Sequence, residues 1–279
     1  RSDIKVAISP ENLRLGSSIP YLKNPDRLVF GIAEQYREKI SSIFPNNYPL
    51  FFVSPNTALL TKHVINSFLA TSVAFANEIG SIAKKYGVNT SELTKSVKSD
   101  SRIGAKAYLQ PGEAFGGGTL GRDVNYLCKI AHENNLELNL IKNIIISNEE
   151  HKLWPFKLIK AHKQFPFLKV LILGATYKEG TDTLRKSNSF SLAESLNSMK
   201  VRCTLCDNLS KERPCVSLED VKNISNQNWD IIMVTKNNTQ FKEFLEELEH
   251  SNKICLIDLK GDYFYLSDKF LEYNSLTSG

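Results

Sequence analysis

Cysteine and histidine are scarce in this chain, and neither forms a cluster. Five cysteines occur among 279 residues, and an odd number in a chain of this length gives no disulfide framework and fits a reducing compartment. Cys203 and Cys206 have the spacing of metal and redox motifs, but no second Cys or His pair lies at zinc-ligand spacing. Because residues three apart on a strand face opposite sides of a sheet, we interpret both cysteines as structural. The five histidines are scattered, and we assign none of them a catalytic or metal-binding role.

Long apolar runs and a large charge excess are also missing. No uninterrupted apolar stretch approaches the roughly 20 residues that span a bilayer, and Arg1–Lys5 lacks the pattern of a signal peptide. The 35 Lys and Arg exceed the 30 Asp and Glu by only five, without the basic runs or interleaved aromatics of nucleic-acid-binding proteins. We therefore expect a soluble cytoplasmic protein that binds neither membranes nor nucleic acid. Its mild basicity is compatible with a phosphorylated small molecule as ligand.

What the chain does have is enough hydrophobic content, 42%, to form two or more folded units. The first 54 residues alternate short apolar strands with one amphipathic helix, which is typical of a fragment of an α/β layer. Because this segment begins on a strand with too little before it to form a sheet, we expect it to be the end of a domain whose first part is missing. The expected strands are residues 5–9, 28–32 and 50–54, and the expected helix is 32–44.

The middle of the chain has a helical pattern. From Thr57 to about Tyr86 apolar residues recur at the helical period, which predicts a helix about 45 Å long at 1.5 Å per residue. A helix of this length with apolar residues on more than one face predicts a homodimer. Further helices are expected at residues 90–98, 123–134 and 138–163.

The last third returns to alternating strands and helices, which predicts a parallel sheet with helices on both faces. The expected strands are 168–173, 201–207, 229–235 and 254–259, and the expected helices are 190–199 and 239–250. The turn Gly174-Ala175-Thr176 lacks the second and third glycines of a dinucleotide fingerprint, so we expect no NAD in this domain. Polar residues follow the strand ends, where ligands of such sheets bind: Tyr177, Lys178, Thr181, Asp182, Arg185, Asp207, Asp258 and Lys260. A phosphate site and an ordinary solvated loop both remain open for Lys178 and Arg185.

The most informative segment is the glycine-rich loop within residues 108–123. Three consecutive glycines, Gly116–Gly118, let the backbone approach a ligand and turn N–H groups toward a polar or anionic group. Thr119, Arg122 and Asp123 then supply a hydroxyl, a cation and a carboxylate within two helical turns. The alternative is a flexible loop before a helix whose first turn is capped by Thr119 or Asp123.

Several motifs occur together in an order that resembles the UDP-glucose and GDP-mannose dehydrogenase family. They are Ser9-Pro10-Glu11-Asn12-Leu13-Arg14-Leu15-Gly16, Asn24-Pro25-Asp26-Arg27, Lys62-His63-Val64-Ile65-Asn66-Ser67-Phe68-Leu69-Ala70, Arg102-Ile103-Gly104, the glycine loop through Asp123, and Tyr177-Lys178 with Thr181-Asp182-Thr183-Leu184-Arg185-Lys186-Ser187. The series covers essentially the whole chain, and it is far more specific than any one motif.

The resemblance implies a fold of the α/β class in three parts. Residues 1–55 would be the end of an NAD-binding Rossmann domain, 56–164 a central helical domain for dimerisation and the catalytic loop, and 165–279 a Rossmann-like domain that binds the UDP of a nucleotide sugar. It also implies that the chain is the final two thirds of an enzyme whose NAD is bound mainly by the missing domain.

In this family the carbon-six alcohol of a UDP- or GDP-hexose is oxidised twice, by two NAD molecules, to a carboxylate. The resemblance implies that Lys62 and Asn66 hold the reacting hydroxyl, and that Glu11 and Asp123 manage protons or a bound water. For Lys62 and Asn66, the alternative is a solvated helix face. The implied substrate-binding residues are Leu13, Arg102, Tyr108, Leu109, Phe115, Gly116, Gly117, Tyr177, Lys178, Arg185 and Lys260, and the implied NAD contacts are Arg122 and Arg185; no metal is implied.

The chain also departs from the family pattern. Thr119 stands where the family has a cysteine nucleophile within Gly-Gly-Ser-Cys, and a Thr hydroxyl ionises far less readily than a thiol. Other replacements are Arg122 for Lys, Leu15 for Glu, Thr183 for Asp, Lys186 for Glu, Asn188 for Pro, and Lys260 for a common Arg. Three functions stay open: a nucleotide-sugar dehydrogenase without covalent catalysis, a two-electron oxidoreductase that stops at the aldehyde, and a non-catalytic nucleotide-sugar-binding protein.

Overall fold

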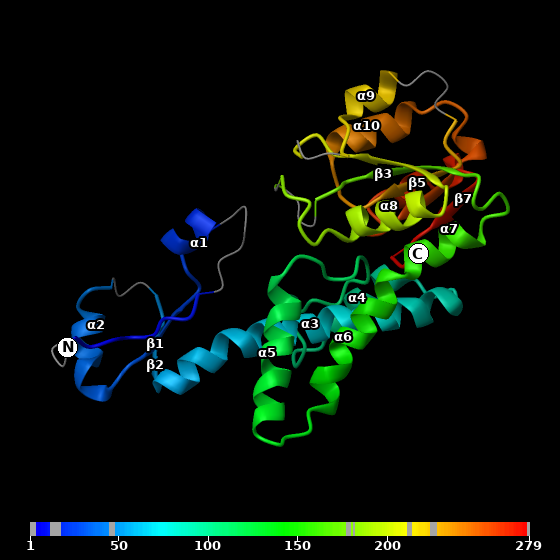
Figure 1. Ribbon diagram of the computed structural model, residues 1–279. Coiled ribbons are helices and arrows are strands. Elements are labelled where there is room, and N and C mark those ends of the chain that lie inside the picture. The colour runs from blue at the N-terminus through cyan, green and yellow to red at the C-terminus, as the bar shows by residue number, and fades with distance from the viewer. Residues whose placement is uncertain are drawn as a thin grey trace.

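The three parts of the molecule are arranged along and above one long helix (Figure 1). A small α/β lobe lies at one end of helix α3, a helical body surrounds the rest of α3, and a sheet domain lies above that body. The architecture is the mixed α/β fold that the sequence predicts. The computed structural model describes residues 4–11, 18–44, 48–176, 180, 182–210, 214–223 and 228–277.

The N-terminal lobe contains a short parallel sheet. Strands β1 (Leu28–Gly31) and β2 (Leu50–Val53) pair in parallel, and the aromatic ring of Phe30 packs 4.9 Å from that of Phe44. The strand expected at residues 5–9 is reduced to one antiparallel bridge between Ile8 and Gly31. The expected helix at 32–44 is shorter and divided, and the helical segments of the lobe are α1 (Ser18–Lys23), η1 (Glu34–Tyr36) and α2 (Arg37–Ser41).

Helix α3 (Pro55–Lys85) is the predicted long helix. The Ser54 hydroxyl accepts a hydrogen bond from the Thr57 N–H, and Pro55 occupies the first turn, where its missing N–H costs nothing. Ala70 and Ala74 of α3 form a small core with α5 and α6, because small side chains let the helices approach closely.

Helix α3 is more apolar than the absence of long apolar runs in the sequence suggests. Although no uninterrupted apolar run is present, an 18-residue window of this helix has a mean hydropathy of 1.2, which is apolar enough for a membrane span, and 28% of the window is buried. The amides of Asn66 and Asn77 on α3 both hydrogen-bond to other segments of the protein. These contacts make α3 part of the folded helical body.

The remaining central helices correct two expectations. Helix α5 begins at Thr119, four residues before the expected start, and its N-cap is Gly118, so neither Thr119 nor Asp123 caps it. The single helix expected at 138–163 is two helices, because Pro155 cannot continue the hydrogen bonding of the preceding turn. The bounds are α4 (Thr90–Ser99), α5 (Thr119–Glu133), α6 (Asn139–Lys152) and α7 (Trp154–Ala161).

The C-terminal domain is a five-stranded parallel sheet in the order β4-β3-β5-β6-β7. Helices α7 and α8 cover one face, and α9 and α10 cover the other. Cys206 is buried on one face, and Cys203 packs against the other, as their spacing predicted. Helix α9 and strand β7 were not expected. The elements are β3 (Lys169–Leu173), α8 (Asn188–Ser198), β4 (Arg202–Cys206), α9 (Leu218–Asn223), β5 (Ile231–Val234), α10 (Thr239–Glu247), η2 (Ser251–Lys253), β6 (Cys255–Asp258), η3 (Phe264–Lys269) and β7 (Glu272–Asn274).

Candidate functional site

A buried polar pair joins α3 to α5 at the centre of the candidate site. Asn66 Nδ2 donates a hydrogen bond to Asp123 Oδ2 at 2.5 Å, and the two residues are only 7% and 0% exposed. Arg122 Nε donates to the other carboxylate oxygen at 3.0 Å. His63 Nδ1 lies 3.3 Å from that same oxygen, without the geometry of a hydrogen bond. Both oxygens of Asp123 are therefore engaged.

The surroundings of Asp123 favour its ionised form. Burial opposes ionisation, but the hydrogen bonds from Asn66 and Arg122, with the charges of Arg122 and His63, outweigh it and hold the pKa of Asp123 below its usual value. His63 is not among the residues predicted for the site. It lies three residues before Asn66, so the two share one side of the helix, and this spacing was the available signal.

Lys62 and Glu11 form a second polar pair next to the first. Lys62 Nζ donates to Glu11 Oε1 at 3.1 Å, and the two side chains are 28% and 54% exposed. Lys62 is one turn before Asn66 on α3, so the two pairs are neighbours. Thr119 is exposed at the start of α5, one turn before Asp123. Within the described part of the chain, no hydrogen bond to the Thr119 hydroxyl is found.

Two asparagines and a histidine hold the glycine loop against the central helices. Asn77 Oδ1 accepts from the Gly112 N–H at 2.8 Å, and His151 Nε2 lies 2.7 Å from the Gly112 carbonyl oxygen. Asn148, which is 1% exposed, accepts from the Phe115 N–H at 2.9 Å and donates to the Phe115 carbonyl at 3.0 Å. These paired bonds fix the loop backbone against α3 and α6.

The glycine loop is also attached to the C-terminal domain. The Gly117 N–H donates to the Lys186 carbonyl at 3.0 Å, and Asn188 Nδ2 donates to the Ala114 carbonyl at 2.8 Å. Asn77, Asn148 and His151 are not among the predicted site residues, since a single polar residue on a helix has several possible roles. Asn188 is predicted only as a replacement for Pro.

A cavity of about 920 Å³ lies where the glycine loop, α5, α6, α7 and α8 meet. This is within the usual range for small-molecule sites. Arg122 lines the cavity and also hydrogen-bonds Asp123, so it connects the cavity to the buried Asn66–Asp123 pair. Predicted site residues in the lining are Phe115, Gly116, Gly117 and Arg122, and other polar or charged lining residues are Asn125, Glu149, Lys152, Lys186, Ser187, Asn188, Ser191 and Ser195.

Other predicted binding residues lie outside this cavity. Tyr108 and Leu109 line a separate hollow of about 290 Å³, and Arg102 is exposed and bonded to both carboxylate oxygens of Asp100. Arg185 is exposed in the turn before α8, and Lys260 follows strand β6. Leu13, Tyr177 and Lys178 fall outside the described residues.

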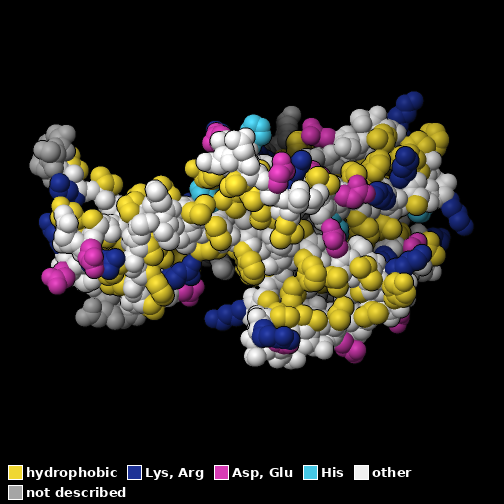
Figure 2. All heavy atoms as spheres, turned by 90° about the horizontal axis from the view of Figure 1, so that it is seen from below, with side chains coloured by type: hydrophobic (Ala, Val, Ile, Leu, Met, Phe, Trp, Pro, Cys, Tyr) yellow, Lys and Arg dark blue, Asp and Glu magenta, His cyan; other side chains and the backbone are white. Residues whose placement is uncertain are grey.

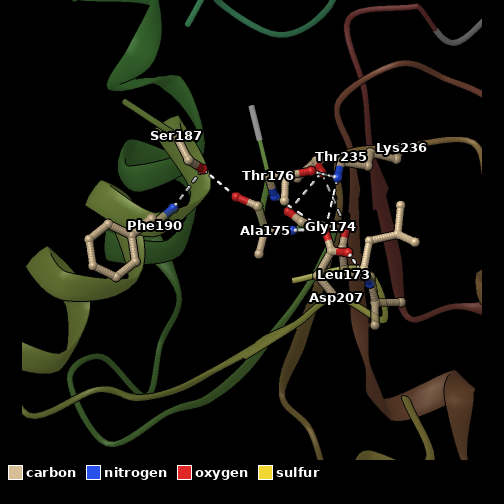
Figure 3. Close-up of polar contacts among 10 residues, drawn as sticks. Leu173, Gly174, Ala175, Thr176, Ser187, Phe190, Asp207, Thr235 and Lys236 are labelled. Carbon is tan, nitrogen blue, oxygen red and sulfur yellow. Dashed lines mark hydrogen bonds and ion pairs between the residues drawn. The ribbon is translucent and has the colours of Figure 1, made fainter. Parts of the chain in front are cut away.

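The turn after strand β3 is closed by the protein's own side chains (Figure 3). Asp207 Oδ2 accepts from the N–H groups of Ala175 and Thr176 at 2.9 and 3.2 Å. Lys236 Nζ donates to the same oxygen at 2.8 Å and also to the Thr176 hydroxyl. Burial opposes the ionisation of Asp207, but these contacts lower its pKa. The N–H groups of Ala175 and Thr176, the first that a pyrophosphate could meet after this strand, are therefore already bonded.

Comparison with known proteins supplies the family. Residues 56–150 match the central domain of the UDP-glucose/GDP-mannose dehydrogenase family, and residues 171–261 match its UDP binding domain. A UDP-glucose 6-dehydrogenase of Rickettsia conorii is 31% identical over 254 residues, which are 85% of this chain and 58% of the relative. A GDP-mannose 6-dehydrogenase of Azotobacter vinelandii is 35% identical over 197 residues, 70% of this chain and 44% of the relative.

Solved structures show the same fold. A UDP-glucose dehydrogenase of the archaeon Pyrobaculum islandicum superposes with a TM-score of 0.82 at 24% identity, over 99% of this chain and 64% of that one. The chain spans about half the length of the curated relatives it matches. The two family domains cover two separate stretches of the sequence in the family order. The glycine loop belongs to the first stretch and is hydrogen-bonded to the second through Lys186 and Asn188. This chain belongs to the UDP-glucose/GDP-mannose dehydrogenase family and contains its central and UDP-binding domains.

Proposed function

We propose that this chain forms the substrate-binding and acid–base part of an NAD-dependent dehydrogenase that oxidises the carbon-six alcohol of a UDP- or GDP-hexose. One observation carries the proposal: Arg122 lines the large cavity and bonds to the buried carboxylate of Asp123. A nucleotide sugar in this cavity would have its diphosphate near Arg122 and Lys186. Its hexose end would then turn toward Asn66 and Lys62.

We assign different roles in the oxidation of the alcohol to the residues of the two polar pairs. Lys62 and Asn66 are donors that stabilise the alcohol oxygen as it gains negative charge. The lowered pKa of Asp123 makes it a weak proton acceptor at neutral pH, so we assign it the task of orienting Asn66. Glu11, which is more exposed and paired with Lys62, is then the better candidate to receive the alcohol proton.

The chain offers only peripheral contacts to NAD, which when bound accepts the hydride from carbon six. The start of the turn after β3 does not favour a dinucleotide, because the N–H groups of Ala175 and Thr176 bond to Asp207. Arg122 and Arg185 remain as the cationic groups that could approach the cofactor, and we infer that most of its binding surface lies outside this chain. We also infer a soluble, cytoplasmic enzyme from the odd number of scattered cysteines and the internal contacts of α3.

Thr119 favours a second candidate, a two-electron oxidoreductase that stops at the aldehyde. Its exposed hydroxyl has no described base to activate it, so a covalent intermediate of the cysteine type is not supported. Thr119→Cys, in a protein that includes the NAD-binding part, should raise the yield of uronic acid if the aldehyde stage limits. The number of NADH molecules formed per sugar molecule consumed measures this yield. An unchanged yield with unchanged binding would contradict the thiol's role.

An apolar stripe on α3 supports a homodimer. Leu60, Val64, Phe68, Phe75, Ile82 and Tyr86 are 44–78% exposed, and at 100° per residue they fall within about 80° of one another on the helix. Figure 2 shows hydrophobic side chains gathered over the middle of the molecule. Lys62 and Asn66 lie on the other side of α3, so association leaves them free.

The dimer is tested by light scattering. Phe68→Glu should convert a dimer into a monomer, because it places a charge in the middle of the stripe. Phe167→Glu, at a residue 82% exposed outside α3, is the matched control and should leave the mass unchanged. A wild-type chain that is monomeric at high concentration would refute this part of the proposal.

The binding proposal is tested by calorimetry of this chain with UDP-glucose and GDP-mannose. We expect one of them to bind, and the double variant Arg122→Met, Lys186→Met to lose binding. It removes two of the three cations that line the cavity, and the third, Lys152, is paired with Glu149. Lys129→Met is the matched control, since Lys129 is also an exposed cation on α5 but pairs with Glu133 outside the cavity. Absence of binding to either compound, or equal binding by the double variant, would contradict the proposed site.

A further inference from the structure

His63 lies beside the buried Asn66–Asp123 pair, and the proposed reaction gives it no role. Its Nδ1 atom is 3.3 Å from Asp123 Oδ1 and is buried without a hydrogen-bond partner among the described residues. At 100° per residue, His63 is about 60° around α3 from Asn66 and about 100° from Lys62. Asn66 therefore lies between Lys62 and His63 on the same side of the helix.

The carboxylate of Asp123 can accept a third hydrogen bond. Asn66 Nδ2 donates to Oδ2, and Arg122 Nε donates to Oδ1 at 3.0 Å. An ionised carboxylate has about four lone-pair positions, so Oδ1 can accept a second hydrogen. The Asp123 side chain is 0% exposed, and a buried carboxylate is stable only when donors surround it. The ring nitrogen of His63 is within reach of the remaining position on Oδ1.

The contact with Asp123 determines which ring nitrogen of His63 carries the hydrogen. A bare Nδ1 would turn its lone pair toward a negative oxygen 3.3 Å away, and two acceptors at this distance repel each other. A hydrogen on Nδ1 makes the same contact attractive, and a change of angle without a change of distance completes the hydrogen bond. Because a neutral imidazole carries only one N–H, Nε2 then keeps its lone pair.

The ring of His63 is supported on its face, and its second nitrogen is open. The Tyr126 ring on α5 lies 4.2 Å away between centroids, inclined by 34°, which limits how far the imidazole can turn. The His63 side chain is 22% exposed. Among the described residues none hydrogen-bonds to Nε2, and Nδ1 is the ring nitrogen that is buried. Nε2 is therefore the nitrogen that solvent or a ligand can reach.

We infer that His63 and Asp123 form an acid–base dyad, in which Asp123 holds the Nδ1–H, Tyr126 holds the ring and Nε2 is the proton acceptor. In an Asp–His pair of this kind, the carboxylate fixes the tautomer and stabilises the imidazolium. When an O–H group gives its proton to Nε2, the O–H bond breaks, an N–H bond forms, and the charged ring stays paired with Asp123. The inference goes beyond the proposed function, because the dyad does not depend on which substrate binds.

Nitrogen-15 NMR of the chain without ligand tests the dyad, because it shows which ring nitrogen carries the hydrogen. We expect the Nδ1–H form of neutral His63 to exceed the Nε2–H form by at least about tenfold, the factor given by a hydrogen bond to a charged group. His162 is an internal control with the opposite expectation, since its Nδ1 accepts from the Gln164 N–H at 3.3 Å. On acidification the proton should add to Nε2 of His63 and to Nδ1 of His162. His63→Gln identifies the signals.

Three further variants show what holds the ring of His63. Asp123→Asn should remove most of the tenfold preference, because a neutral amide attracts the Nδ1–H less than a carboxylate does. Tyr126→Ala should reduce the preference by freeing the ring, whereas Tyr126→Phe keeps the stacking and should leave it unchanged. Tyr126 is 45% exposed, so its variants remain informative if Asp123→Asn does not fold. An Nε2–H form of His63 in the wild type, or an unchanged preference in Asp123→Asn or Tyr126→Ala, would overturn the inference. None of these measurements needs a nucleotide sugar, so their outcome is separate from that of the proposed function.

Discussion

The turn after β3 and the glycine loop before α5 both contain glycine and precede a helix, but their N–H groups are used in opposite ways. In the turn after β3, the N–H groups of Ala175 and Thr176 donate to Asp207 of the same domain. In the glycine loop, Asn77 and Asn148 bond to the backbone before the three glycines, at Gly112 and Phe115. No described side chain caps α5 at Gly118. The first turn is closed by its own carboxylate, whereas the second leaves a helix N-terminus beside a large cavity. Glycine content alone does not show whether a turn is a binding site.

The largest loss of stability is expected when the cation paired with Asp207 in the turn after β3 is removed. Lys236→Met leaves the Asp207 carboxylate buried with its backbone donors only, and should reduce the free energy of unfolding by about 3–5 kcal/mol, as for other broken buried ion pairs. Urea unfolding, followed by the fluorescence of the buried Trp229, measures the loss. The double variant with Asp207→Asn should recover part of it. A loss below about 1 kcal/mol would show that the pair is not needed to close the turn.

A methyl group at Gly174 tests how tightly the closed turn is packed. Gly174 has a φ of +102°, and a Cβ there would lie 2.2 Å from Thr235 Oγ1. Gly174→Ala should therefore cost about 2–4 kcal/mol, from backbone strain and from the contact. Gly87→Ala is the matched control, because Gly87 also has a positive φ but nothing within 4 Å of its Cβ position. Equal losses in thermal unfolding would mean that the contact itself adds no cost.

The support of the open loop is tested at Asn148. Asn148→Ala leaves the N–H and the carbonyl of Phe115 without their partner, which should cost about 2 kcal/mol. It should also speed hydrogen exchange in the glycine loop. Asn143→Ala on the same helix is the control, since Asn143 is exposed and bonds only to Asn139 of its own helix. If both variants unfold at the same urea concentration, the loop does not depend on Asn148.

The smallest loss of stability is expected from a substitution at Gly118, where the glycine loop borders the cavity. A Cβ at Gly118 would lie 3.5 Å from Lys186 Nζ, an ordinary contact with a flexible side chain, so Gly118→Ala should cost less than about 1 kcal/mol. It should nevertheless weaken nucleotide-sugar binding in calorimetry, because the methyl group occupies the cavity wall beside Lys186. Unchanged affinity, in a chain shown to bind, would place the ligand elsewhere.

Much of the fold could be predicted from hydrophobic periodicity. Helix α3 and strands β3–β6 are long or strongly apolar, so their patterns are clear, and the opposite orientations of Cys203 and Cys206 follow from the alternation of a strand. The errors occur where tertiary contacts decide. In residues 5–9, the pairing is limited to one antiparallel bridge between Ile8 and Gly31. Helix α9 and strand β7 are too short to have a distinct pattern.

The sequence by itself determined which residue types were available for the site: Lys62, Asn66, Asp123 and the three glycines occur in one order, and their spacing along α3 and α5 follows from helical geometry. Only the tertiary structure decided which groups meet. It placed Asn66 rather than Lys62 against Asp123, brought His63 to the same carboxylate, and closed the turn after β3 with Asp207 and Lys236. These pairings join residues from 29 to 60 positions apart. At such separations, the periodicity of the sequence does not determine how close two side chains lie in space. Helix packing and burial fix them instead, because a carboxylate removed from water is stable only with donors and cations around it.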